Sequence, residues 1–167
     1  FGDIIPIGLG STIPFYDGNH CLINGIRFEF EGADKPKEKP DKMAIVNTAY
    51  MYLHAPYLWG GRTPMGIDCS GLTQMAYRLN GITIPRDAYK QVELGTTLSF
   101  IEEAEPGDLA FFDDAEGTII HVGMILENSH ILHASGKVRI DRIDQQGIFN
   151  KQLGEHTHKL RLIKQIF

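Results

Sequence analysis

One cysteine of this chain lies where a helix is expected to begin. Cys69 follows a glycine-rich stretch, residues 57–61, and precedes apolar residues spaced three and four positions apart, as on one face of a helix: Leu72, Met75, Ala76 and Leu79. Unpaired backbone N–H groups and the helix dipole at a helix start favour the thiolate, which is the form that attacks carbonyl carbons. Asp68 is a suitable N-cap. The same position also suits a cysteine that is only a small buried side chain.

Two of the seven histidines could serve such a thiol. His121 opens the apolar run 121–125, His133 closes the run 131–134, and the short loop 127–129 between them predicts neighbouring strands. Two imidazoles could then lie side by side, one as the general base for the thiol and the other as the partner that fixes its tautomer. For either histidine taken alone, a satisfied core residue is the alternative.

The other five histidines have polar or turn-like surroundings and no obvious partner: His20, His54, His130, His156 and His158. His156 and His158 form an H-x-H pair near the end of the chain. We interpret this pair as part of a solvated loop in preference to a pair of metal ligands.

The composition is that of a globular chain with a sizeable core, since 43% of the 167 residues are hydrophobic and 22% are charged. A net charge of −5 argues against a nucleic-acid partner, because there is no basic patch to neutralise phosphates. No apolar run approaches the roughly 20 residues that span a bilayer, so no membrane-spanning segment is expected. Two cysteines, Cys21 and Cys69, are too few for a disulfide scaffold, and both are expected to be free.

Three segments are expected along the chain. Residues 1–32 predict β structure, with Asn24-Gly25 as a two-residue hairpin turn. Hairpins alone make a poor core, so this segment is interpreted as the end of a small β-barrel or as an extension packed on the next domain. The charged, proline-containing residues 33–41 predict a linker, and residues 42–167 form the second domain. Because the chain begins with phenylalanine inside strand-like sequence, we expect a longer parent chain.

In the second domain, helical patterns come before strand patterns. Helices are expected from about 42 to 53 after Asp41, from 69 to the Asn80-Gly81 stop, and briefly after Asp87. Strands are expected at five places: 109–112, 119–126, 130–134, 138–140 and 160–166. Helices followed by strands, without βαβ alternation, indicate an α+β fold with an antiparallel sheet.

An ordered set of motifs resembles the NlpC-type family of bacterial cell-wall cysteine peptidases. The motifs are Tyr57-x-Trp59-Gly60-Gly61, Asp68-Cys69-Ser70-Gly71-Leu72, Pro85-Arg86, Gln91, Pro106-Gly107-Asp108-Leu109-x-Phe111-Phe112, His121-Val122-Gly123 and Leu132-His133-Ala134. Each motif alone is weak, whereas their order is specific and covers residues 42–166. The resemblance implies a papain-like α+β peptidase domain whose helices pack on an antiparallel sheet. Residues 1–32 more loosely resemble the end of a bacterial SH3-like barrel.

The resemblance also implies catalytic roles. Cys69 is the nucleophile, His121 is the base and His133 orients the base, in the chain order of papain-like enzymes. The Tyr57 hydroxyl and the Cys69 backbone N–H stabilise the oxyanion.

Substrate-binding roles are implied as well. Asp68 and Ser70 line the acyl-side subsite, where relatives bind a free amino group, and Arg86 suits a substrate carboxylate. The structural alternatives are that Asp68 is only a cap and that Arg86 only pairs with a nearby acid. Asp87 departs from the family, which often has Ser or Thr there, but all three residues cap helices.

The reaction implied by the resemblance is thiol acyl transfer to water, with no metal or other cofactor. The implied partner is the peptidoglycan stem peptide, cut between γ-D-Glu and the following diamino acid, with a preference for a free N-terminal L-Ala. We expect a monomer in an extracytoplasmic place: periplasmic, secreted or in the cell envelope. Three alternatives stay open, namely an inactive cell-wall binding module, an acyltransferase or amidase with the same triad, and a zinc site formed by Cys69, His121 and His133.

Overall fold

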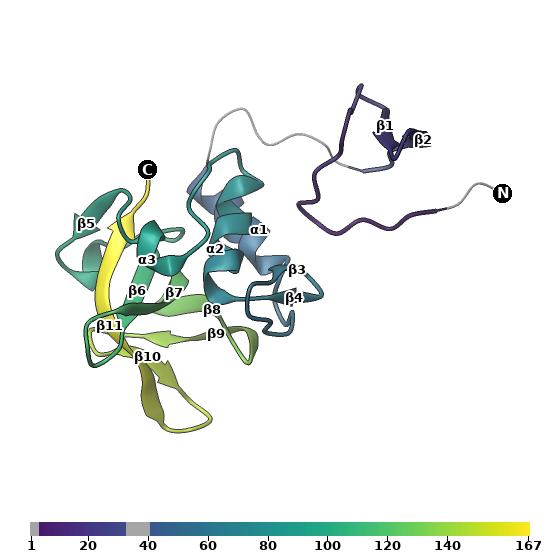
Figure 1. Cartoon of the computed structure of the whole chain (residues 1–167). Coiled ribbons are helices and arrows are strands. Elements are labelled where there is room, and N and C mark those ends of the chain that lie inside the picture. Colours follow the sequence, from purple (N-terminus) through teal and green to yellow (C-terminus); the bar gives the residue numbers. More distant parts are fainter. Residues whose placement is uncertain (1–3, 33–40) are drawn as a thin grey trace.

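The computed structural model describes residues 4–32 and 41–167 of the chain. The elements follow in this order (Figure 1): β1 (His20–Ile23), β2 (Ile26–Glu29), α1 (Lys42–Tyr50), β3 (Arg62–Thr63), β4 (Gly66–Ile67), α2 (Cys69–Arg78), α3 (Ala88–Gln91), β5 (Thr96–Leu98), the short 3-10 helix η1 (Ile101–Glu103), β6 (Leu109–Asp113), β7 (Ile119–Leu126), β8 (His130–Ser135), β9 (Lys137–Ile143), β10 (Gly147–Asn150) and β11 (Glu155–Gln165). After the first hairpin, helices precede the main sheet in the sequence. The predicted α+β class is confirmed.

Seven strands form one antiparallel sheet in the order β10-β9-β8-β7-β6-β11-β5, and β10 also pairs with β11. The six strands β6 to β11 therefore close on themselves. Strand β11 allows this closure because its first half pairs with β10, whereas its second half pairs with β6 and β5. The sequence patterns missed β5 and β10 and placed the start of β11 too late, at residue 160. Residues 155–159 are polar and mostly exposed, so they lack the apolar alternation that marks a half-buried strand.

Two hydrophobic cores lie on the two faces of the main sheet. Along β7, Val122 and Met124 belong to a core that also contains Leu72 of α2, whereas Ile125 belongs to a second core with Phe112 of β6. Successive side chains of a strand point to opposite faces. His121 therefore shares the face of Ile125.

The amino-terminal hairpin forms at its predicted turn. Strands β1 and β2 pair with Ile23 opposite Ile26, and Asn24 and Gly25 both have positive φ, 51° and 79°, as a two-residue turn of this kind requires. The other described residues of this segment form turns and irregular backbone, so β structure covers less of it than expected. Figure 1 draws the hairpin in purple, away from the main sheet. The predicted linker lies almost entirely outside the described residues.

The helices begin where the sequence predicts. The Asp41 side chain accepts a hydrogen bond from Met43 N at 3.1 Å, and Asp68 caps α2 through Gly71 N. The helix α1 ends at Tyr50, three residues before the expected end.

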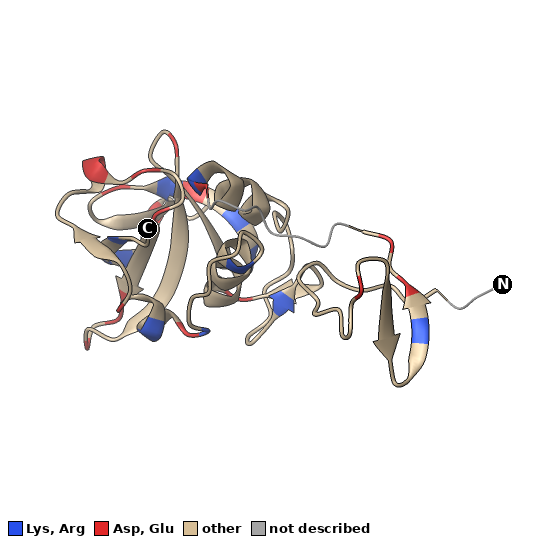
Figure 2. Ribbon diagram, turned by 90° about the horizontal axis from the view of Figure 1, so that it is seen from above, with Lys and Arg blue, Asp and Glu red and all other residues tan. Residues whose placement is uncertain are grey.

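Acidic and basic residues are interspersed along the ribbon (Figure 2). Within the described ranges, none of the helices is long and apolar enough to cross a membrane.

Candidate active site

The cysteine lies at the first residue of α2, beside strand β7. The Cys69 side chain is buried, with 6% of the residue exposed. The backbone N–H groups of Val122, the residue after His121, of Ser70 and of Cys69 itself lie close enough to the Cys69 sulfur to favour its ionised form. The thiol is therefore held next to the residue that carries the first imidazole.

The pKa of the thiol shows how the helix start and burial compete. Burial raises the pKa of Cys69, the nearby Asp68 charge also raises it, and the three backbone N–H groups act in the opposite direction. The N–H groups at the helix start lower the pKa of Cys69, as expected. Burial outweighs them, so the pKa of the thiol lies above its ordinary value. The resting side chain is a thiol that needs a base to become a nucleophile.

The two predicted imidazoles are hydrogen-bonded to each other. Strands β7 and β8 pair with Gly123 opposite His133, which confirms that they are neighbours. His121 Nε2 lies 2.9 Å from His133 Nδ1, and both residues are buried. This contact uses one nitrogen of His121, so Nδ1 is the nitrogen left for an exchange of a proton.

A glycine makes room for this pair. A Cβ atom on Gly123 would lie 2.7 Å from Ile131 Cδ1 and 3.0 Å from His133 Cβ, closer than side-chain atoms normally approach. A side chain at position 123 would therefore push against the strand that holds His133. The glycine of the His-Val-Gly motif thus has a packing role.

His121 is a neutral base in this environment. Burial lowers the pKa of His121 well below its ordinary value, and the charges that His133 and His158 can carry lower it further. A neutral imidazole can accept a proton from a thiol, whereas an imidazolium cannot.

His158 is the site residue that the sequence analysis assigned wrongly. It lies on β11 instead of a solvated loop, and its ring centroid is 4.2 Å from that of His121, with the planes inclined by 30°. Burial is the main reason why the pKa of His158 is lowered to about 4. The alternation of His156 and His158 would have placed both side chains on one face, but a β-bulge pairs them with the consecutive residues Phe149 and Ile148 of β10, so the two histidines face opposite ways.

A second missed residue lies beyond His133. This residue is Asp141, whose Oδ2 lies 2.9 Å from His133 Nε2. Arg139 Nε is 2.6 Å from the same oxygen. Asp141 and Arg139 both come from β9, whose sequence, Lys-Val-Arg-Ile-Asp-Arg-Ile, reads as an ordinary strand with charged residues on one face. Only the pairing of β9 with β8 brings the carboxylate to the histidine.

Asp68 and Arg86, expected to bind substrate, form an ion pair with each other. Arg86 Nη2 lies 2.6 Å from Asp68 Oδ2, and Nη1 lies 2.9 Å from Oδ1. The Asp68 oxygens also accept from the backbone N–H groups of Gly60 and Gly71, both at 2.7 Å. Ser70 Oγ is 2.8 Å from Arg86 Nη1. Burial alone would raise the pKa of Asp68, but Arg86 and the two N–H groups outweigh it and lower the pKa.

Glycines and Gln91 hold this cluster together. A Cβ atom on Gly71 would collide with the Gly61 carbonyl oxygen, so the glycine-rich loop can approach the start of α2 only because Gly71 lacks a side chain. Gln91 is fully buried, and its Nε2 donates to Ser70 O and Pro85 O at 3.0 and 2.8 Å. Gln91 therefore ties the chain before Arg86 to the first turn of α2.

Tyr57 lies within electrostatic reach of the nucleophile. Burial raises the pKa of its hydroxyl, and the charges of Cys69 and Asp68 raise it further. A protonated hydroxyl near the thiol is a hydrogen-bond donor suited to an oxyanion.

The zinc alternative does not fit this geometry well. Both ring nitrogens of His133 are occupied, one by His121 and one by Asp141. In the part of the chain that the structure describes, no group of three His, Cys, Asp or Glu side chains is placed to hold a metal ion.

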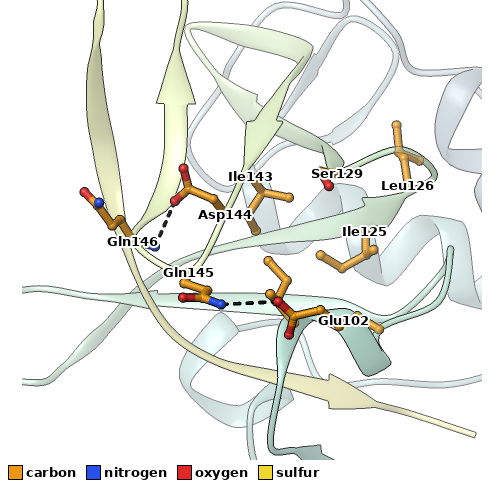
Figure 3. Close-up of a pocket in the computed structure, with 10 residues that line it drawn as sticks. Glu102, Ile125, Leu126, Ser129, Ile143, Asp144, Gln145 and Gln146 are labelled. Carbon is orange, nitrogen blue, oxygen red and sulfur yellow. Dashed lines mark hydrogen bonds between the residues drawn. The ribbon is translucent and has the colours of Figure 1, made fainter.

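A cavity of about 450 Å³ lies elsewhere on the main sheet (Figure 3). It is lined by residues of η1, the end of β7 and the segment after β9: Ile101, Glu102, Ala104, Ile125, Leu126, Ser129, Ile143, Asp144, Gln145 and Gln146. None of the proposed catalytic side chains lines this cavity, so the proposed active site lies at a different place on the main sheet.

A buried thiol at a helix start, held against the backbone that follows one histidine, with that histidine hydrogen-bonded to a second one, is an arrangement typical of cysteine peptidases. The comparisons identify the family. The model of the NlpC/P60 family matches residues 54–157 of this chain, which therefore belongs to the NlpC/P60 family.

Two named relatives match 61–68% of the chain. It is 36% identical over 119 residues to a gamma-D-glutamyl-L-lysine dipeptidyl-peptidase of Bacillus cereus, a match that covers 68% of this chain and 35% of the relative. It is 40% identical over 105 residues to dipeptidyl-peptidase 6 of Lysinibacillus sphaericus, covering 61% and 36%. The chain thus spans about a third of the length of these relatives.

Solved structures show the same fold. An NlpC/P60 family protein from Bacillus cereus superposes with a TM-score of 0.67 at 24% identity, covering 92% of this chain and 52% of that one. The NlpC/p60 domain of the peptidoglycan hydrolase SagA gives a TM-score of 0.56 at 34% identity, covering 61% and 89%.

Proposed function

We propose that this protein is a cysteine endopeptidase that hydrolyses murein stem peptides at the bond between γ-D-Glu and the following diamino acid. The observation that carries the proposal is the hydrogen bond between His121 Nε2 and His133 Nδ1, beside a thiol whose sulfur lies at Val122 N. It leaves His121 Nδ1 to exchange a proton with Cys69. The names of the relatives support the choice of the γ-D-glutamyl bond.

In the proposed mechanism, His121 removes the thiol proton as the sulfur attacks the amide carbonyl carbon of γ-D-Glu. The oxyanion that forms is stabilised by the Cys69 N–H and the Tyr57 hydroxyl. His121 then gives its proton to the leaving amine, the C–N bond breaks, and a thioester remains on Cys69. His121 next takes a proton from water, which attacks the thioester, and the carboxylate of the product leaves as the thiol is restored.

The acyl-side subsite is proposed to form around Asp68 and Arg86. A carboxylate has about four acceptor positions, and those of Asp68 are filled by Gly60 N, Gly71 N and two Arg86 nitrogens. A substrate ammonium would therefore take the place of Arg86 on Asp68. Arg86 would then bind the α-carboxylate of D-Glu, so that both charges stay paired. This exchange favours a peptide that carries a free L-Ala amine.

The wider setting is proposed from the same assignment. Residues 42–167 are taken as a papain-like domain with helices packed on the sheet, residues 1–32 as the end of an SH3-like domain, and residues 33–41 as the linker between them. A stem-peptide substrate favours a place outside the cytoplasm, and the protein is taken as a monomer.

The test is mass spectrometry of defined muropeptides incubated with the protein and with a Cys69→Ala variant. The proposal expects cleavage after γ-D-Glu by the parent protein, and intact peptide with the variant. Products in which an added amine is acylated would favour an acyltransferase, and loss of activity with a chelator would favour a metal enzyme. An unchanged peptide under all conditions would contradict the proposal.

A second comparison tests the subsite. The ratio of kcat/KM for L-Ala-γ-D-Glu-diamino acid peptides with a free and with an N-acetylated amine should be about tenfold to a hundredfold, as expected for one charge-assisted hydrogen bond of about 1.5–3 kcal/mol. Asp68→Asn should reduce this ratio. Equal values for both peptides would leave Asp68 as a helix cap only.

A further inference from the structure

We propose that Asp141 is a positioning residue of the site: its carboxylate, held by Arg139, sets the tautomers of both histidines so that His121 presents an unprotonated Nδ1 to the thiol. The inference rests on the proposed role of His121 as the base. It concerns a residue two strands away from that base, on β9 instead of β7.

The first step is the state of Asp141 itself. The residue is 8% exposed, and Arg139 binds both of its oxygens, with Nε 2.6 Å from Oδ2 and Nη2 2.8 Å from Oδ1. Burial alone would raise the pKa of Asp141, but hydrogen bonds from His133 and Arg139 outweigh it and lower the pKa. Asp141 is therefore ionised at neutral pH, and an ionised carboxylate only accepts hydrogen bonds.

The second step is the tautomer of His133. Because Asp141 Oδ2 is an acceptor at 2.9 Å, His133 Nε2 must carry a proton. A neutral imidazole has one donor and one acceptor nitrogen, so His133 Nδ1 is an acceptor.

The third step carries this choice to His121. An acceptor at His133 Nδ1 requires a donor opposite, so the 2.9 Å contact is a hydrogen bond from the N–H at His121 Nε2. The remaining nitrogen of His121, Nδ1, then has a free lone pair. This is the form that can remove a proton from Cys69.

The same ring positions would also allow the opposite pattern. If no carboxylate faced it, His133 could carry its proton on Nδ1 and donate it to His121 Nε2. His121 would then carry its proton on Nδ1 and could not act as a base there. The two patterns fill the same space, so packing does not choose between them. The charge of Asp141 makes the choice.

The direct test is long-range ¹H–¹⁵N NMR of histidine-labelled protein at neutral pH, which reports which nitrogen of each ring is protonated. We expect both His121 and His133 to carry their proton on Nε2 in the parent protein. A proton on Nδ1 of either ring would overturn the proposal without the need for any variant.

The variant test uses Asp141→Asn. This change replaces one of the two carboxylate oxygens by an NH₂ group, which cannot accept a hydrogen bond, so the side chain can no longer accept from His133 and Arg139 with both positions. We expect Nδ1–H forms to appear and kcat to fall about tenfold to a hundredfold with little change in KM, the range for loss of an outer partner of a functional histidine. Asp144→Asn is the matched control, because Asp144 pairs with His156 at 3.0 Å on the same sheet without contacting the proposed catalytic side chains. Parent-like tautomers and kcat in Asp141→Asn, or an equal loss in Asp144→Asn, would overturn the proposal.

A readout without substrate separates this inference from the proposed function. Alkylation of Cys69 by iodoacetamide at neutral pH depends on proton removal from the thiol. We expect it to slow in Asp141→Asn and to stay unchanged in Asp144→Asn, even if the natural substrate were not a stem peptide. Parent-like alkylation in a folded Asp141→Asn protein would count against the inference alone.

Discussion

The imidazole rings of His158 and His121 lie against each other, with centroids 4.2 Å apart. His158 comes from the last strand of the chain and is itself fixed by a 2.9 Å contact between its Nδ1 and Thr157 Oγ1. Since burial is the largest cause of the lowered pKa of His121, a ring that covers it contributes to keeping the proposed base neutral. The end of the chain thus takes part in the site.

His158→Ala should move the acidic limb of the kcat/KM profile to higher pH. The change admits water to His121 and removes an imidazole that becomes positively charged only near its pKa of about 4, and both effects raise the pKa of His121, so the neutral base is lost sooner as the pH falls. His158→Phe keeps the cover and should shift the limb less. His156→Ala on the same strand is the control, and identical profiles for His158→Ala and the parent would contradict the prediction.

Acid should destabilise the fold before its carboxylates titrate. The pKa values of His121 and His158 are lowered, that of His158 to about 4, from an ordinary value of 6.5. The unfolded chain then binds more protons than the folded one below about pH 6.5, so stability falls as the pH drops through that window. Urea denaturation between pH 7.5 and 4.5 measures this slope. His158→Ala should flatten it, and a pH-independent midpoint would refute the argument.

Iodoacetamide should label Cys69 much faster than Cys21. Both residues are free and 6% exposed, so access alone predicts similar rates. Only Cys69 lies at a helix start with Val122 N–H at its sulfur, and the preceding residue, His121, is the proposed base that takes up its proton. Peptide mapping after timed labelling gives both rates in one sample. Equal rates in the folded protein would mean that the thiol is not activated.

His133→Asn should keep more activity than His133→Ala. An asparagine can accept from His121 through its oxygen and direct its NH₂ group toward Asp141, so it retains part of the chain of hydrogen bonds. We expect about a tenfold loss for Asn and about a hundredfold loss for Ala in kcat. His121→Asn should be inactive, because an amide is no base. Full activity of both His133 variants would remove His133 from the site.

Gly123→Ala should lower kcat about tenfold or more. The added Cβ atom would lie only 2.7–3.0 Å from atoms of Ile131 and His133, so these residues would have to move. Small displacements of catalytic groups reduce the reaction rate by large factors. Gly8→Ala is a suitable control, because the nearest atom to its Cβ would be 3.9 Å away. Parent-like kinetics of Gly123→Ala would show that the strand yields without moving His133.

Local rules were enough to predict the elements that carry the proposed catalytic residues. The cap at Asp68, the helix start at Cys69 and the strands of His121 and His133 follow from side-chain spacing and turn residues, and each involves contacts within a few residues or between consecutive strands. Such contacts leave a periodic signal in the sequence. For the same reason the hairpin at Asn24-Gly25 was predictable.

Tertiary structure alone decided the surroundings of these residues. His158 reaches His121 only because β11 closes the sheet against β10 and β6, and Asp141 reaches His133 only through the pairing of β8 with β9. The balance of the Cys69 pKa likewise depends on how deeply α2 is buried. Charges and imidazoles on exposed-looking strands have the same sequence pattern whether they face water or each other. Which of the two occurs is set by how the sheet closes, and that depends on contacts between residues far apart in the chain.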